Sequence, residues 1–119
     1  MPAVLDIGSQ RVLVCDSQGE RIDSRARGMD LVGKALGLGA TMVAIPVARI
    51  DDVFFELRSG IAGEIAQAAV NYGLRLAIIG DIGAHVARSN ALRDWVTECN
   101  RGGDLWFVTD LDALKARLA

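Results

Sequence analysis

Residues 60–81, GIAGEIAQAAVNYGLRLAIIGD, hold the two elements that decide the fold. In the first half, apolar side chains recur at helical spacing, which predicts an amphipathic helix. Its apolar stripe consists of Ile61, Ile65, Ala68, Ala69 and Tyr72, and Gly73 stands where a left-handed glycine ends a helix. The second half, LRLAIIGD, is apolar without alternation, as is typical of a strand buried on both faces. A helix leading into a buried strand is the repeating unit of an α/β protein.

The same unit recurs along the rest of the chain, which reads as one α/β domain over residues 1–119 in the order β-β-α-β-α-β-α-β-α. The segments before the central helix are strands at 3–7 and 11–22 joined in a hairpin, a short helix from Asp30 to Gly39, a strand at 41–45 and a loop at 46–58. After the central strand come a connection at 83–90, a helix with Ser89 as its N-cap, a strand at 105–110 and a final helix.

Strands separated by helices have to run parallel, so the sequence predicts a mixed, mainly parallel sheet with an antiparallel N-terminal hairpin. The last three strands are apolar throughout, so both faces of the sheet need cover. If all four predicted helices pack on one face, a second copy of the chain would cover the other, and we expect a homodimer on this ground.

Composition excludes several classes of function. A net charge of −2 and a pI of about 5.3 lack the positive field that nucleic acid requires. The apolar runs are too short to cross a membrane and the N-terminus has no signal-peptide pattern, so we expect a cytoplasmic protein. Cys15 and Cys99 are interpreted as reduced, buried thiols.

The start of the central helix, RSGIAG at 58–63, is the first candidate site. The Ser59 hydroxyl can cap the helix, which contributes about 1 kcal/mol. The free N–H groups and the positive helix end would also hold a phosphate or carboxylate, with Arg58 as an added cation and Gly60 and Gly63 allowing close approach. A third interpretation is a surface that contacts a partner. The three roles stay open, with capping the simplest.

The predicted carboxyl ends of the strands are the second candidate site, because ligands of parallel α/β sheets gather there. The candidates are Asp51 with its neighbour Asp52, Asp81, His85 and Asp110. Converging carboxylates could bind Mg²⁺ or act as an acid-base pair, and His85 could exchange a proton with Asp81. Turns and helix caps use Asp equally well, however, and no nucleophile-base pair is readable. We therefore assign no catalytic residue, no metal ligand and no cofactor.

Two resemblances add to this. The element order, with RSGIAG opening a helix after a strand and a loop, resembles the STAS domain, the sulfate-transporter and anti-sigma-factor-antagonist module. In that family a motif of the form D-S-[ST]-G-[LV] starts the second helix, and a kinase phosphorylates its second hydroxyl. Ser59, Gly60 and Ile61 match its last three positions, whereas Leu57 and Arg58 do not match the first two.

The second resemblance is more specific. The stretches FFELRSGIAGEI, NYGLRLAIIGD and ALRDWVTECNRGGDLWFV are similar to those of a small bacterial family known only as a domain of unknown function, over residues 54–108. Together these observations predict a non-enzymatic regulatory or protein-interaction domain, switched by phosphorylation of Ser59. The alternative is a protein that binds an anionic or polar small molecule, and a carboxylate- or metal-dependent enzyme is the third class.

Overall fold

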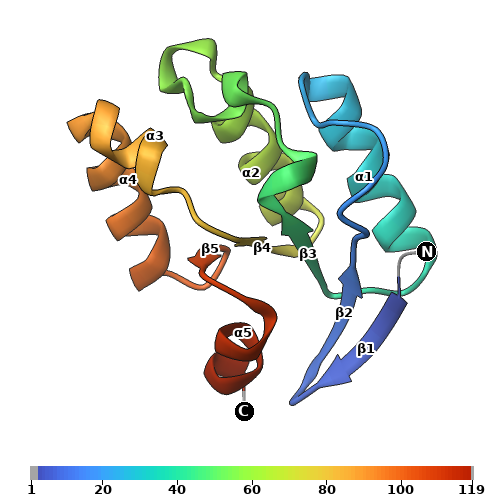
Figure 1. Cartoon of the computed structure of the whole chain (residues 1–119). Helices are drawn as coiled ribbons and strands as arrows, with labels where there is room; N and C mark the ends of the chain where they lie inside the picture. The colour runs from blue at the N-terminus through green and yellow to red at the C-terminus, as the bar shows by residue number, and fades with distance from the viewer. Residues whose placement is uncertain (1–2, 119) are drawn as a thin grey trace.

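The computed structural model describes residues 3–118, which form a five-stranded sheet with helices on both faces (Figure 1). The strands are β1 (Ala3–Ile7), β2 (Gln10–Val14), β3 (Met42–Pro46), β4 (Arg75–Ile79) and β5 (Leu105–Val108). The helices are α1 (Arg25–Gly37), α2 (Ile61–Asn71), α3 (Gly83–Arg88), α4 (Asn90–Arg101) and α5 (Leu111–Leu118). Three short 3₁₀ turns lie between β3 and α2: η1 (Val47–Arg49), η2 (Asp52–Phe55) and η3 (Leu57–Ser59).

The strands lie side by side in chain order, β1-β2-β3-β4-β5. β1 pairs with β2 in an antiparallel hairpin, and β2, β3, β4 and β5 pair with one another in parallel. The predicted α/β class, the mixed sheet and the N-terminal hairpin are confirmed. Because each parallel strand is the neighbour of the one before it, right-handed crossovers place all the connecting helices on one face of the sheet.

That face carries the larger core, in which β3 contributes Val43 and Ile45 beneath α1, α2 and α4. The opposite face carries a smaller core beneath α5. Its sheet residues are Val12, Met42, Ala44, Ala77 and Trp106, each at most 7% exposed, and α5 contributes the fully buried Leu114. The condition under which a second copy would be needed, with all helices on one face, is therefore not met. Because α5 covers the second face, that face does not require a second copy of the chain.

The Trp106 ring strengthens the contact between α5 and the sheet. The Arg117 guanidinium lies 3.8 Å from the ring centroid and that of Arg75 lies 4.4 Å from it, both within the range of cation-π attraction. The indole N–H donates to the carbonyl of Gly102 at 2.7 Å. Trp106 thus fixes both the helix that covers it and the turn before its own strand.

Several predicted boundaries change in the structure. α1 begins at Arg25 and not at Asp30, because Ser24 caps it by accepting the Arg27 N–H. The predicted connection at 83–90 contains the short helix α3, which Ser89 separates from α4. Ser89 caps α4 as expected, since its hydroxyl accepts the Leu92 N–H at 3.1 Å. Within residues 3–118 no helix is both long and apolar enough to cross a membrane.

Replacing Leu114 with alanine tests whether α5 is needed to close the sheet. Leu114 is fully buried against the second face, so Leu114→Ala should lower the free energy of unfolding by about 2–5 kcal/mol. Leu36→Ala is the matched control, because Leu36 is 39% exposed and should cost less than about 1 kcal/mol. Urea denaturation of both variants measures the difference, and equal losses would contradict this account of the second face.

Candidate functional site

Ser59 is exposed and is the last residue of η3, so it lies one residue before the N-cap of α2. The N-cap of α2 is Gly60, whose φ of +77° lies in the left-handed region that glycine adopts without strain. The Gly60 carbonyl accepts the Glu64 N–H and so starts the helix. The prediction that Ser59 is the N-cap is therefore wrong, although its hydroxyl still accepts an N–H from the first turn, that of Ile61 at 3.3 Å.

The Ser59 hydroxyl also makes a second bond, donating to the Val53 carbonyl at 3.0 Å. This bond joins η3 to η2 across six residues. Phe54 and Phe55 belong to η2 and are 3% and 5% exposed, so they anchor the loop in the core. One exposed side chain thus connects the loop above the core with the first N–H of α2.

Two other residues of the first candidate site, Arg58 and Gly63, border separate grooves. Arg58 is exposed and borders a groove of about 520 Å³, which we call the Phe55 groove. It is lined by Asp52, Phe55, Glu56, Leu57, Arg58, His85, Arg88, Ser89 and Ala91. Gly63 instead borders a groove of about 360 Å³ between α2 and α4. At both Gly60 and Gly63 a Cβ atom would meet nothing within 4 Å, so the surface at the start of α2 is open.

His85 forms part of the floor of the Phe55 groove. Its ring stacks on Phe55 with centroids 4.1 Å apart and an interplanar angle of 16°. Its Nε2 lies 3.8 Å from Oδ1 of Asp52, a side chain that is 82% exposed. The suggested pairing of His85 with Asp81 is therefore wrong. Asp81 instead accepts the Gly83 N–H at 2.8 Å and shapes the turn into α3.

The predicted strand-end carboxylates each bond to a backbone N–H of their own turn. Asp51 caps η2 by accepting the Val53 N–H at 3.1 Å and also pairs with Arg21 at 3.5 Å. Asp110 accepts the Ala113 N–H at 2.7 Å and starts α5. With Asp81 in the same role, all three act as turn or helix caps, the simpler of the two interpretations. Within residues 3–118, no three His, Cys, Asp or Glu side chains lie close enough together to hold a metal ion.

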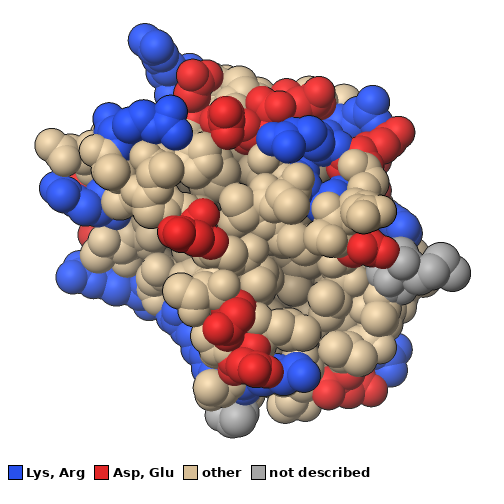
Figure 2. Space-filling model, viewed as in Figure 1, with Lys and Arg blue, Asp and Glu red and all other residues tan. Residues whose placement is uncertain are grey.

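Arg88 also lines the Phe55 groove, although its place in the sequence did not mark it as a candidate. Arg88 follows His85 by three residues, so a helix over 83–88 would have placed the two on one face. The sequence predicts a connection over 83–90 instead. Charges of both signs border the groove, Arg58 and Arg88 against Asp52 and Glu56. On the face shown in Figure 2, acidic and basic side chains lie next to one another along the upper rim of the molecule.

A second cavity of about 370 Å³ lies between β2, the loop that follows it and α1. Cys15 and the basic residues Arg21, Arg27, Lys34 and Arg49 line it. Most of these cations already have partners. Arg49 donates to the carbonyls of Glu20 and Asp16, and Arg27 pairs with the Glu20 carboxylate. The Arg27 guanidinium lowers the pKa of Glu20. These bonds hold the loop in place.

Comparison with known proteins shows the family. A family model described as a domain of unknown function, DUF4180, matches residues 7–118, and the chain belongs to this family. No curated protein and no solved structure matches significantly. The expected membership of an uncharacterised domain family is confirmed.

The two thiols provide a test of burial around these cavities. Both cysteines are free, with Cys15 buried and Cys99 partly exposed, and burial raises the pKa of each thiol. Because only the thiolate is nucleophilic, both should react with iodoacetamide more slowly than free cysteine, at rates that rise with pH. Cys99 should be labelled first in folded protein, and Cys15 only after unfolding. Peptide mapping that finds Cys15 labelled first would contradict this order.

Proposed function

We propose that this domain is a STAS-like, non-enzymatic interaction module whose partner contacts are switched by phosphorylation of Ser59. The observation that carries the proposal is the position of the hydroxyl, exposed at the start of α2 and bonded to the Val53 carbonyl. The match of Ser59, Gly60 and Ile61 to the STAS motif supports it further. The same proposal holds that the protein is bacterial and cytoplasmic and that the surface around Ser59 binds a protein partner.

The switch would act on both the shape and the charge of this surface. A kinase would transfer the γ-phosphoryl group of ATP to Ser59 Oγ with release of ADP, and the hydroxyl proton would pass to a base of the kinase. The resulting ester oxygen has no hydrogen, so the bond to the Val53 carbonyl is lost and η2 is released from η3. The phosphate adds nearly two negative charges beside Arg58 and the positive end of α2, where they are stabilised.

Phosphate mapping tests the modification. Protein purified from its native host should carry one phosphate on Ser59 under some growth condition, and Ser59→Ala should abolish it. Ser17→Ala is the control, because Ser17 is another exposed serine, in the loop after β2. In hydrogen exchange, Ser59→Ala should speed amide exchange over residues 53–61, because it removes the two hydrogen bonds of the hydroxyl, each worth about 0.5–1.5 kcal/mol. Absence of phosphate under all growth conditions, or phosphate on other residues only, would count against the switch.

A second candidate function is binding of an anionic or polar small molecule in the Phe55 groove. The stacked rings of Phe55 and His85 offer an aromatic floor, and Arg58 and Arg88 offer cations at its rim. An aromatic floor with charged groups at the rim suits a small polar ligand, because the rings give contact area and the charges orient the ligand. No catalytic step is proposed, since Asp51, Asp81 and Asp110 already bond within their own turns.

Native mass spectrometry tests this second function. A co-purified ligand should disappear in Arg88→Ala and remain in Arg93→Ala, an exposed arginine on α4 outside the groove. Titration with inorganic phosphate should shift the ring resonances of His85 in the wild type and much less in Arg88→Ala. Unchanged His85 resonances together with no bound mass would rule out this site.

A further inference from the structure

The two edges of the sheet are treated differently. At the β5 edge, the Asn100 side chain accepts the Phe107 N–H at 2.7 Å, which occupies a backbone donor that would otherwise face outward. Asn100 belongs to α4, so a helix end covers this edge. At the other edge, four of the five residues of β1 are exposed, and β1 forms the outer border of the sheet in Figure 1.

The register of the hairpin shows which β1 groups are free. Ile7 and Gln10 flank a two-residue turn and form the first hydrogen-bonded pair, so Ala3, Leu5 and Ile7 point their backbone groups at β2. Val4 and Asp6 point theirs outward. The backbone bonds of β2 follow the same alternation. Arg11, the residue opposite Asp6, makes its backbone hydrogen bonds with Thr41, which precedes β3, and not with β1.

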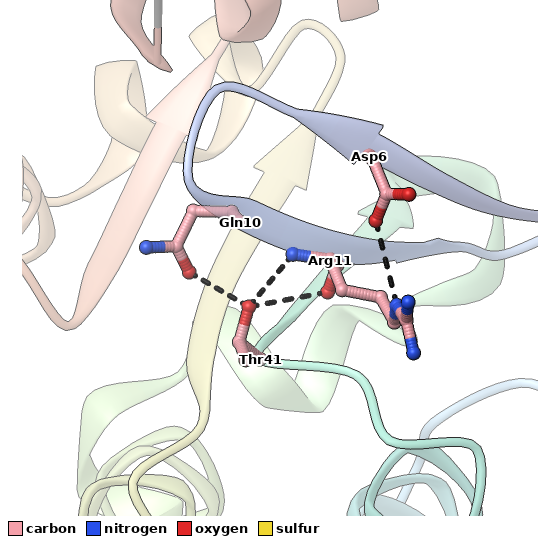
Figure 3. Close-up of polar contacts among 4 residues, drawn as sticks. All are labelled: Asp6, Gln10, Arg11 and Thr41. Carbon is pink, nitrogen blue, oxygen red and sulfur yellow. Dashed lines mark hydrogen bonds and ion pairs between the residues drawn. The ribbon is translucent and has the colours of Figure 1, made fainter.

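β1 lacks the features by which edge strands avoid pairing. Its five residues pair with β2 without a bulge and include neither lysine nor proline. Val4 and Leu5 are 41% and 37% exposed, on opposite faces of the strand. The single charge, Asp6, already pairs with Arg11 at 3.4 Å, so the strand is close to neutral (Figure 3).

The hairpin is also fixed before any partner arrives. Thr41 accepts the Arg11 N–H at 2.9 Å, and its hydroxyl lies 2.9 Å from Oε1 of Gln10, as Figure 3 shows. These bonds tie the turn end of the hairpin to the residue that precedes β3. An edge held in this way loses little further conformational entropy when another strand adds to it.

We propose that β1 pairs antiparallel with β1 of a second copy of this chain, with Leu5 opposite Leu5 of the copy. This register places Val4 opposite Asp6 of the partner, so the outward-facing backbone groups exchange hydrogen bonds in pairs. It also keeps the two Asp6 carboxylates apart, whereas a register centred on Asp6 would set like charges opposite each other. Charge therefore disfavours the Asp6-centred pairing, and only the Leu5-centred pairing sets all five residues of one β1 opposite those of the other. In it the two sheets become one. A five-residue edge is a small interface, and the dimer should be weak. This inference does not depend on Ser59.

Sedimentation velocity over a range of protein concentrations tests the dimer. Wild-type protein should show a concentration-dependent dimer. Leu5→Lys should weaken it by roughly tenfold or more, because two lysines then face each other across the axis. Leu36→Lys is the matched control, since Leu36 is a leucine of similar exposure on α1 and should leave the dimer intact. A wild type that stays monomeric at high concentration, or a dimer equally stable in both variants, would overturn the proposal.

Cross-linking tests the register independently of affinity. Opposed residues of a non-hydrogen-bonded antiparallel pair have Cα atoms about 4.5 Å apart, within disulfide range. Copper-catalysed oxidation by dissolved oxygen should therefore convert Leu5→Cys into a covalent dimer. Val4→Cys should cross-link poorly, because the two copies of residue 4 lie about 7–8 Å apart on the diagonal. Wild-type protein controls for Cys15 and Cys99, and preferential cross-linking of Val4→Cys would refute the Leu5-centred register.

Discussion

The structure depends on the handedness of its crossovers. With the strands in chain order, right-handed connections send α1, α2 and α4 to the same face of the sheet. The second face then has α5 as its helical cover, an element of eight residues. Ala44 and Ala77 on that face are small enough to let α5 approach closely, and Leu114 of α5 is buried in one cluster with them and Trp106. One short helix therefore decides whether the chain buries both faces of its sheet without a partner.

The loop between β3 and α2 shows how a capping residue becomes a candidate for regulation. Its three 3₁₀ turns carry the chain over Phe54 and Phe55 before α2 begins. Gly60 takes the left-handed conformation that the entry to α2 needs, which leaves Ser59 outside the helix with an exposed hydroxyl. A serine at the N-cap itself would have been committed to α2 alone. Here the same oxygen also holds the loop to itself through Val53.

The two edges of the sheet differ in how well their backbone groups are covered. A helix end and an amide side chain close the β5 edge, whereas the β1 edge has backbone groups facing outward and a neutralised charge. The homodimer expected from the sequence rested on an uncovered sheet face, and α5 removes that reason. The β1 edge offers a different reason for a homodimer, which is its outward-facing backbone N–H and C=O groups and not an exposed apolar face.

The amino-acid sequence alone was enough to predict the class of fold, the hairpin, most of the strands and the caps Ser89 and Asp110, because these depend on local periodicity and on short-range bonds from a side chain to its own turn. It did not determine α3, which is too short for a periodic pattern, or the start of α1 at Ser24. Only the tertiary structure decided that α5 covers the second face, that His85 stacks on Phe55 and meets Asp52, and that Ser59 bonds to Val53. The reason is physical: these contacts join segments whose approach is set by sheet order and crossover hand, which no local pattern of residues encodes.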